Sequence, residues 1–314
     1  MKILLSNPGA GVYLGHPLAP LTTWKIGGPA EYLAVPQDLE DVYKILSHAY
    51  RRGRPVFFLG RGSNVLISDA GLPGLTLHLA KSLQKLARQG EVIRAGAGVS
   101  LPRLAQAAAD WGLAGCEFLA GIPGTVGAAV RLNAGAQGSN LGQLLKRAWV
   151  LTPRLQLLEF AAPELGFAYR SSLLLNFPHW LVVEAEFALT AEAPPEAIQA
   201  RMRDFLAARR ASQPSNPRSC GSVFKNPPDG PPAGYLIEQV GFKGRRCGGA
   251  QVSWKHANFI LNQGGATAAD IKTLIHQIQE TVWVRFGIKL EREVVFLPED
   301  LNMPSREEAR HPGG

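Results

Sequence analysis

The chain has 314 residues, of which 46% are hydrophobic and 18% are charged, and its formal net charge is +8. A chain of this length is too long for a single ordinary hydrophobic core, so we expect two or three subdomains. Its 34 glycines and 23 prolines argue against a helical bundle and favour a loop-rich mixed α and β fold. The positive charge suits a partner with phosphates or carboxylates, but the basic residues are scattered and no nucleic-acid-binding motif is present, so nucleic acid is not an expected partner.

Capping residues and apolar spacing predict the elements in the first half of the chain. Asp38 begins a helix with apolar residues on one face, and Gly53 ends it. Ser100 caps a second helix with Pro102 in its first turn. The strands that we expect in this half are 55–59, 65–69, 75–79 and 91–95.

The second half contains two helices and a break. A charged helix at 196–210 leads into the proline-rich segment 213–217, where we place the main domain boundary. Thr267 caps a long helix with apolar residues at helical spacing, and Gly287 ends it. We expect a disordered tail at 303–314. The expected strands are 148–151, 156–160, 179–189, 257–262 and 288–296.

Cysteine usage and hydropathy indicate a cytoplasmic protein. Cys116, Cys220 and Cys247 are too few and too widely spaced for a disulfide framework or a metal site of CxxC type, so we expect no metal. The apolar stretch at the start is too short for a signal peptide. The longest uncharged run, 118–130, contains a proline and several glycines, so we expect no contact with a membrane.

Two glycine-rich segments are suited to close backbone contact with a ligand. In the first, Gly60 and Gly62 flank an arginine between two strands, where successive N–H groups form an anion-binding nest. The second segment carries Gly121, Gly124 and Gly127. Neither is a dinucleotide-binding fingerprint or a P-loop, and each alone is consistent with a structural turn. Together they favour a large phosphate-bearing cofactor held by the backbone.

The run Gly221-Ser-Val-Phe-Lys-Asn-Pro carries the densest set of reactive groups. Gly221 permits a bend, and Pro227 prevents continuation as a helix or central strand. Ser222 then lies beside Lys225 and Asn226, which suit anionic oxygens and polar groups. A surface turn is the alternative interpretation. A hydrolase nucleophile is disfavoured because the second glycine of G-x-S-x-G is missing and no histidine or aspartate lies nearby.

These and other segments resemble the UDP-N-acetylenolpyruvoylglucosamine reductase family, whose members have a vanillyl-alcohol-oxidase-like FAD-binding domain. They occur in the family's order from about residue 20 to 297. The matching segments are Thr23-Trp-Lys-Ile-Gly-Gly-Pro-Ala, Leu59-Gly-Arg-Gly-Ser-Asn-Val-Leu, Leu119-Ala-Gly-Ile-Pro-Gly-Thr-Val-Gly-Ala, Leu132-Asn-Ala-Gly, Tyr169-Arg-Ser-Ser, Gly221–Pro227, Lys255-His-Ala-Asn-Phe-Ile-Leu-Asn and Leu290-Glu-Arg-Glu-Val.

The resemblance implies an α+β fold. The expected parts are a two-lobed FAD-binding domain at 1–211, split near residue 80, a substrate-binding domain at 212–300 and a tail at 301–314. It also implies a monomer with non-covalent FAD and with NADPH as co-substrate. The implied reaction reduces UDP-N-acetylglucosamine enolpyruvate to UDP-N-acetylmuramate for peptidoglycan synthesis. The expected FAD contacts are Gly60, Arg61, Gly62, Ser63, Asn64, Gly121, Ile122, Gly124, Thr125, Gly127, Ala128, Asn133 and Gly135.

The resemblance also assigns catalytic roles. The flavin carries the redox chemistry, and hydride arrival at the β-carbon leaves negative charge on the α-carbon and its carboxylate. Ser222 is the expected proton donor to the α-carbon, Arg170 binds the carboxylate, and Glu293 stabilises the enolate. A surface ion pair is the alternative for Arg170, and a solvated edge charge is the alternative for Glu293. The expected substrate-binding residues are Tyr169, Lys225 and Asn226.

The chain departs from the family pattern at two places. Ala128 stands where the family usually has a second glycine, and only about fifty residues separate Arg170 from Ser222. The short spacing indicates the branch that lacks an additional tyrosine-bearing loop over the substrate. Two other functions remain open: a flavoprotein oxidase of the same cofactor fold, and a basic module that binds uridine nucleotides or RNA. The segment 60–64 has no histidine or cysteine for covalent flavin attachment.

Overall fold

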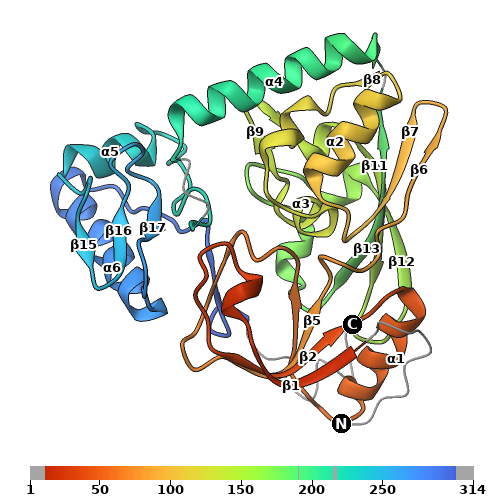
Figure 1. Cartoon of the computed structure of the whole chain (residues 1–314), viewed down its shortest axis with the longest axis horizontal. Coiled ribbons are helices and arrows are strands. Elements are labelled where there is room, and N and C mark those ends of the chain that lie inside the picture. The colour runs from red at the N-terminus through yellow and green to blue at the C-terminus, as the bar shows by residue number, and fades with distance from the viewer. Residues whose placement is uncertain (1–10, 190, 215–217, 302–314) are drawn as a thin grey trace.

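The computed structural model describes residues 11–189, 191–214 and 218–301. Three groups of elements follow one another along the chain and lie around a common centre (Figure 1). We call them the first lobe (11–78), the second lobe (86–212, its described part) and the C-terminal unit (218–301). The tail expected at 303–314 lies outside the described residues, and the division into domains near residues 80 and 211 stays a prediction.

The first lobe is a four-stranded sheet with one helix against it. The strand order is β1-β2-β5-β3, antiparallel between β1 and β2 and parallel elsewhere. The helix begins as predicted, because the Asp38 carboxylate accepts a hydrogen bond from the N–H of Asp41. Its buried face packs into one hydrophobic cluster with the strands. The elements are β1 Gly11–Pro17, β2 Pro29–Val35, α1 Leu39–Tyr50, β3 Val56–Leu59, β4 Val65–Ile67 and β5 Leu72–His78. Sequence patterns did not predict β1 and β2.

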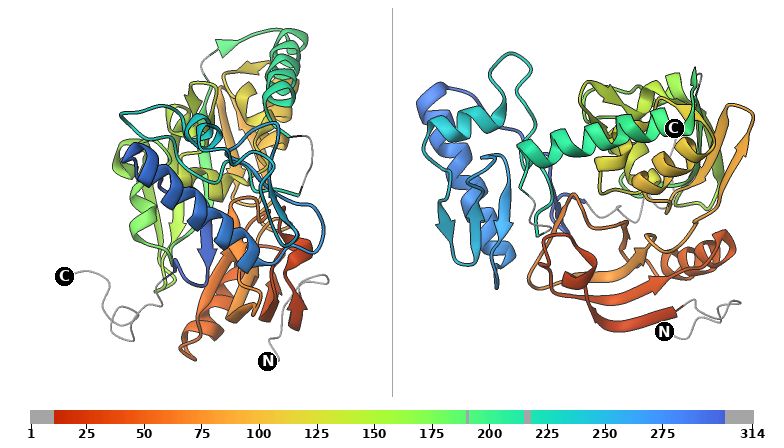
Figure 2. Two further views of the ribbon diagram at one scale, coloured as in Figure 1. Left: turned by 90° about the vertical axis from the view of Figure 1, so that its left-hand side faces the viewer. Right: turned by 45° about the horizontal axis from the view of Figure 1, so that its top comes forward.

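The second lobe is an antiparallel sheet of five strands in the order β12-β11-β13-β7-β6, with helices packed against it. The Ser100 cap on α2 is confirmed, since its Oγ accepts from the N–H of Arg103. The longest helix here, α4, runs along the second lobe toward the C-terminal unit (Figure 2). The elements are β6 Leu86–Gln89, β7 Val92–Gly96, α2 Leu101–Asp110, β8 Leu113–Ala114, α3 Val126–Leu132, β9 Gly135–Ala136, β10 Ser139–Asn140, β11 Leu145–Leu151, β12 Leu157–Ala161, β13 Leu181–Ala188, β14 Ala191–Glu192 and α4 Pro195–Ser212.

The C-terminal unit packs two helices against a small sheet. The α6 helix has the predicted ends: Thr267 caps it with Asp270 in a capping box, and Gly287 ends it with φ +66°. The apolar residues predicted for its buried face all lie in the core. The elements are α5 Ala233–Gln239, β15 Arg246–Cys247, β16 Ala250–Val252, β17 Ile260–Asn262, α6 Ala268–Phe286 and β18 Val295–Leu297.

Two strands predicted here are shorter than expected. Residues 253–259 form a loop instead of the start of β17, closed by the hydrogen bond from Ser253 N to Phe259 O (2.8 Å). Residues 291–294 precede β18 and pair with the segment around Phe224 by a single antiparallel bridge at Arg292. Both segments also hold the run at 221–227 through their backbones, since Val223 N donates to Asn258 O and Lys225 N donates to Glu291 O, each at 2.9 Å.

Buried contacts join the C-terminal unit to the first lobe. Strand β18 pairs in parallel with β4, residue Val295 opposite Val65. Trp24 is fully buried in the hydrophobic cluster of the C-terminal unit, and its indole N–H donates to the carbonyl of Ile260 at 2.8 Å. Asn262 in turn donates to the carbonyl of Trp24 at 2.9 Å. Trp24, from the N-terminal segment, is thus part of the hydrophobic core of the C-terminal unit.

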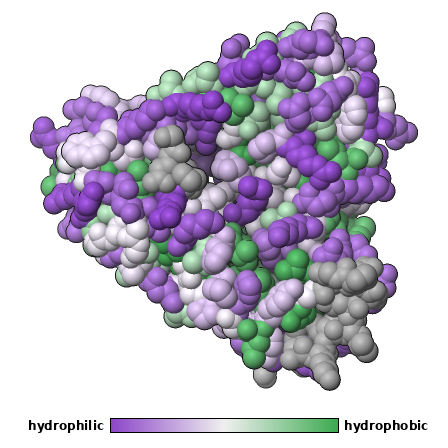
Figure 3. Space-filling view, in the orientation of Figure 1, coloured by the Kyte–Doolittle hydropathy of each residue, from purple (hydrophilic) through white to green (hydrophobic). Residues whose placement is uncertain are grey.

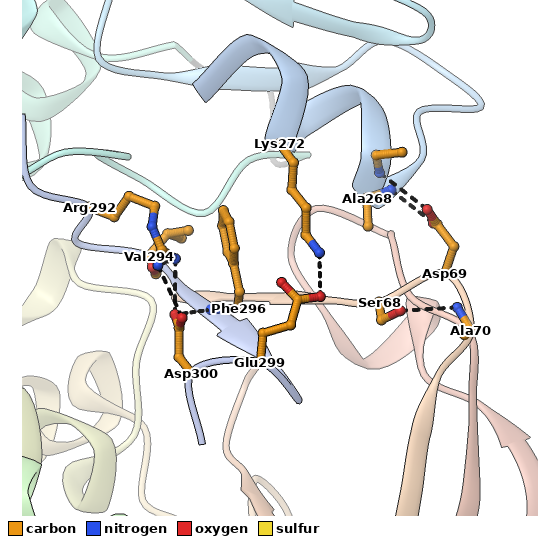
Figure 4. A network of polar contacts seen from close by, with 11 residues as sticks. Ser68, Asp69, Ala70, Ala268, Lys272, Arg292, Val294, Phe296, Glu299 and Asp300 are labelled. Carbon is orange, nitrogen blue, oxygen red and sulfur yellow. Dashed lines mark hydrogen bonds and ion pairs between the residues drawn. The ribbon is translucent and has the colours of Figure 1, made fainter. Parts of the chain in front are cut away.

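Polar contacts reinforce this junction (Figure 4). The Asp69 carboxylate accepts from the N–H groups of Ala268 (2.8 Å) and Ala269 (3.2 Å) at the start of α6. Arg292 makes a two-pronged ion pair with Asp300 at 2.9 and 3.0 Å. Carboxylates at a helix N-terminus satisfy its free N–H groups and complement its dipole. The Asp69 contacts fix the C-terminal unit against the first lobe, and the Arg292 pair holds the end of that unit.

The surface is mostly polar, as expected when the apolar residues lie in buried cores. Hydrophilic residues cover most of the face in Figure 3, and apolar side chains are scattered over it. Within the described residues, no helix combines the length and the apolar composition that a membrane span requires.

Candidate active site

A cavity of about 300 Å³ lies where the three parts meet, and we call it the first cavity. It is lined by the predicted catalytic residues Ser222, Arg170 and Glu293, so the structure brings all three together. The predicted cofactor residues that line it are Ser63, Asn64, Gly121, Ile122, Gly124, Ala128 and Gly135.

The backbone around Ser222 is held rigidly. Gly221 adopts φ +84°, which confirms the need for glycine before the serine. The buried side chain of Asn258 binds both polar groups of the Phe224 backbone, accepting from N–H at 2.9 Å and donating to C=O at 2.8 Å. The N–H of Glu293 donates to the carbonyl of Val223 at 2.8 Å. Ser222 and Glu293 therefore lie on paired segments of one small framework.

Arg170 comes from the second lobe and meets Glu293 across the cavity. Arg170 Nε lies 2.7 Å from Glu293 Oε1, and the two side chains are only 22% and 17% exposed. Arg170 occupies the tip of a tight turn and adopts φ +52°, which is uncommon for a residue other than glycine. Asn64 donates to the carbonyl of Glu293 at 3.0 Å, which links the first glycine-rich segment to the ion pair.

Burial shapes the ionisation of this site. Burial raises the pKa of Glu293, and the charges of Arg170 and Lys225 oppose that shift. Cys220 also lines the first cavity, and burial, reinforced by the Glu293 charge, raises the pKa of its thiol well above the usual value. Cys220 is therefore held as a thiol, which does not favour nucleophilic attack or flavin attachment.

A second cavity of about 600 Å³ lies on the other side of the ion pair. Arg170, Glu293 and Leu132 line both cavities, so the ion pair forms part of the wall between them. Lys225 lines the second cavity and pairs with the exposed Glu291 at 2.5 Å. A ligand that extends through both cavities would pass the ion pair.

Six predicted cofactor residues do not line the first cavity: Gly60, Arg61, Gly62, Thr125, Gly127 and Asn133. Three of the glycines serve close packing of protein against protein. A Cβ on Gly60 would lie 2.8 Å from Thr125 Oγ1, and one on Gly62 would lie 2.5 Å from the carbonyl of Leu21. A Cβ on Gly127 would lie 2.9 Å from that of Ala97, where α3 packs on the sheet. These three glycines therefore allow other protein segments to pack closely against the loops that line the cavity.

The predicted substrate residues Tyr169 and Asn226 lie outside both cavities. The hydroxyl of Tyr169 accepts from the N–H of Asn226 at 3.5 Å, and its ring lies 5.5 Å from the Arg170 guanidinium. The Asn226 side chain accepts from the N–H of Ala233 at 3.0 Å, at the start of α5. Both therefore support neighbouring segments in this structure.

Sequence patterns missed Arg209 and Asn258. Arg209 lines the first cavity from α4, packs against Gly121, and has a pKa lowered by burial and by the neighbouring charge of Arg170. Nothing in the charged pattern of α4 separates Arg209 from Arg210, which is exposed. Asn258 belongs to a matched segment, but its contact with Phe224 depends on the folded loop. His256, in the same loop, accepts from the N–H of Asn258 at 3.3 Å and stacks edge-on against Phe259.

The first cavity suits a flat, phosphate-bearing cofactor. Small residues line one side, namely Gly121, Gly124, Ala128, Gly135 and Ala136. Their backbones can approach a ring closely, and the guanidinium of Arg209 offers a cation to an anionic group. These residues fit FAD. Among the described residues, no group of three or more acidic, cysteine or histidine side chains is arranged to hold a metal ion.

Comparison with known proteins identifies the family. Residues 213–297 match the C-terminal domain of UDP-N-acetylenolpyruvoylglucosamine reductase, and residues 30–157 match an FAD binding domain. A relative from Carboxydothermus hydrogenoformans, named UDP-N-acetylenolpyruvoylglucosamine reductase, is 45% identical over 94% of this chain and 96% of its own length. The chain belongs to the UDP-N-acetylenolpyruvoylglucosamine reductase family.

Other members agree over nearly the whole chain. The Listeria monocytogenes enzyme of that name is 42% identical over 93% of this chain and 97% of its own length. The crystal structure of the Thermus caldophilus enzyme is 35% identical, covers 92% of this chain and 99% of its own, and superposes with a TM-score of 0.77. The family membership confirms the predicted resemblance and the α+β fold, and it makes this chain an oxidoreductase with an FAD-binding domain.

Proposed function

We propose that this chain reduces the enolpyruvyl group of UDP-N-acetylglucosamine enolpyruvate to UDP-N-acetylmuramate, with electrons from NADPH that pass through bound FAD. The observation that carries the proposal is that Ser222, Arg170 and Glu293 line one cavity whose other wall is built of small residues. The reductases that this chain resembles are named for this substrate. UDP-N-acetylmuramate is a precursor of peptidoglycan, and the proposed reaction takes place in the cytoplasm.

The proposed division of labour assigns one role to each residue. When bound, FAD supplies the hydride for the β-carbon of the enolpyruvyl group. Arg170 binds the substrate carboxylate, which a permanent planar cation does well, and so stabilises the negative charge that develops there. Glu293, with its pKa raised by burial, can hold a proton near that charge and donate a hydrogen bond. Ser222 donates the proton to the α-carbon.

The remaining residues have proposed binding roles. Lys225 lines the second cavity and suits the diphosphate of the nucleotide, exchanging its exposed partner Glu291 for phosphate oxygens. The FAD contacts we propose are Ser63, Asn64, Gly121, Ile122, Gly124, Ala128 and Gly135, with Arg209 added. Tyr169 and Asn226 would reach substrate only through a rearrangement of the loops that hold them. We further propose that the enzyme acts as a monomer, with a substrate-binding domain at 212–300.

Separating the two half-reactions tests the proposal. The FAD-loaded protein should be bleached anaerobically by NADPH, and the enolpyruvyl substrate should restore its colour. In Ser222→Ala, NADPH should still bleach the flavin while recolouring slows by about 10²–10⁴-fold, the range for a lost general acid. Thr281→Ala is the control, because that residue of α6 lines neither cavity and its hydroxyl donates to Gln277 O. Slowing of the NADPH step alone in Ser222→Ala would contradict the role of Ser222, and wild-type protein recoloured only by oxygen would contradict the function.

A further inference from the structure

The turn that carries Arg170 is strained and tight. Ala168 and Ser171 exchange two backbone hydrogen bonds, at 3.1 and 3.2 Å, so that Tyr169 and Arg170 form the tip. A non-glycine residue with positive φ costs about 1–3 kcal/mol and persists only where its surroundings determine it fully. The φ of +52° at Arg170 therefore requires anchors elsewhere.

The side chain of Arg170 is held only in part, by its ion pair with Glu293. Its Nε is close to Glu293, but in the described part of the chain no acceptor is aligned with the Nε–H for a hydrogen bond. Its other neighbours are the ring of Tyr169, itself 58% exposed, and the like charge of Arg209. The direction of the guanidinium thus depends on where the backbone turn lies.

Two buried side-chain contacts hold that turn, one on each side of the tip. Asn133 Nδ2 donates to the carbonyl of Ala168 at 2.8 Å. Ser172 Oγ donates to the carbonyl of Arg131 at 2.6 Å. Asn133 and Ser172 are both only 4% exposed. Both contacts attach the turn to the C-terminal end of α3.

The side-chain amide of Asn133 is engaged inside the protein. Its Oδ1 accepts from the N–H of Gly142 at 2.9 Å, so both halves of the amide are used inside the protein. It also ends α3 with φ +45°, a conformation that asparagine tolerates better than most residues. Ala128 and Leu132 of the same helix line the first cavity. One helix therefore carries both a wall of the cavity and the support of Arg170.

We propose that Asn133 is a positioning residue that aims Arg170 at the substrate carboxylate and at Glu293, with Ser172 as its partner. This inference rests on the proposed function. It replaces the contact with FAD that the sequence predicts for Asn133, and it explains why a buried amide stands at the junction of the two segments.

Two substitutions separate this role from cofactor binding. Asn133→Gly keeps the positive φ and removes the amide, whereas Asn133→Asp keeps the acceptor for Gly142 and replaces the donor to Ala168 with a charged oxygen. In both, recolouring at saturating enolpyruvyl substrate should slow by about tenfold or more, because a misplacement of 1 Å can cost about 10²-fold. The dissociation constant of FAD should change by less than about threefold.

A second measurement does not depend on turnover. The groups that face Glu293 are Arg170, Lys225 and the Cys220 thiol, and of these only Arg170 should move in the variants. Because Arg170 holds the pKa of Glu293 down, its displacement should raise that pKa. NMR titration of FAD-loaded protein with carboxyl-labelled glutamate would show the shift, with Glu293→Gln identifying the resonance.

Matched variants complete the test. Ser172→Ala should reproduce the slow recolouring, and Ser172→Thr, which keeps the hydroxyl, should restore it. Ile45→Val, in the buried core of the first lobe, is the control for lost stability alone, and its flavin should recolour at the wild-type rate. An unchanged Glu293 pKa in Asn133→Gly, which adds no charge, would overturn the proposal. So would FAD affinity weakened by about tenfold or more with normal recolouring of the loaded enzyme, which would make Asn133 a cofactor ligand. Wild-type protein that the enolpyruvyl substrate does not recolour would refute the proposed function instead, and the NMR result would still decide the position of Arg170.

Discussion

Trp24→Ala should weaken the junction between the N-terminal segment and the C-terminal unit. Trp24 is 0% exposed in a core whose other members, Ile26 and Leu66 apart, come from residues 220–296. Its partner Ile260 lies 236 positions away along the chain. Removing a buried aromatic side chain costs about 3–5 kcal/mol, which includes the cavity left behind. Native domains are stable by only about 5–15 kcal/mol, so this loss is large.

A conservative variant divides that loss into parts. Trp24→Phe keeps most of the apolar volume but loses the donor to the Ile260 carbonyl, which should cost about 1–3 kcal/mol because the acceptor stays buried. Trp254→Ala is the matched control, since that tryptophan belongs to the same unit but is 70% exposed. We expect it to change the free energy of unfolding by less than about 0.5 kcal/mol.

Urea denaturation followed by circular dichroism and by flavin fluorescence measures these differences. The expected order of stability is wild type, Trp254→Ala, Trp24→Phe and Trp24→Ala. A Trp24→Ala protein as stable as Trp254→Ala would refute the reasoning, because the buried contact would then contribute nothing to the junction.

Two further predictions concern the same junction and the site. Asp69→Ala should lower the free energy of unfolding by about 1–2 kcal/mol, because the start of α6 loses two hydrogen bonds and a favourable charge. Asp69→Asn loses the same charge but keeps one acceptor, so it should lower the free energy of unfolding less; equal losses in urea denaturation would contradict a contribution from that hydrogen bond. Burial raises the pKa of Glu293 above the unfolded value of 4.5, so the folded form keeps that proton to higher pH and wild type loses stability as pH rises through the folded pKa. Glu293→Gln cannot lose a proton, so its stability relative to wild type should grow between pH 4 and pH 8, and a constant difference would show that Glu293 ionises without cost.

Local signals in the sequence predicted the helices α1, α2, α4 and α6, but not the short helices α3 and α5. Asp38, Ser100 and Thr267 each cap the helix expected of them, because a cap and its N–H partner lie within three residues. Strands depend on partners far away, which local patterns do not show. The strand expected at 288–296 is mostly a bridge to the run at 221–227, and only its end pairs with β4.

The candidate site was predicted unevenly for the same reason. Ser222, Arg170 and Glu293 were identified by resemblance, and the fold gathers them in one cavity. The partner of Asn133 lies 35 positions away, so no local pattern could separate a buried support from a cofactor contact. Asn258 holds Phe224 across 34 positions in the same way.

The pairing of β18 with β4 has a consequence for how the protein is made. Residues Val65–Ile67 leave the ribosome long before Val295–Leu297 exist, and at about 5–20 residues per second the interval is about 10–50 s. The interval between synthesis of Trp24 and of its partner Ile260, 236 positions later, is slightly longer. Throughout that time a nascent chain carries an unpaired strand and an uncovered indole, which are features that chaperones bind. The first lobe is begun first during synthesis and completed last.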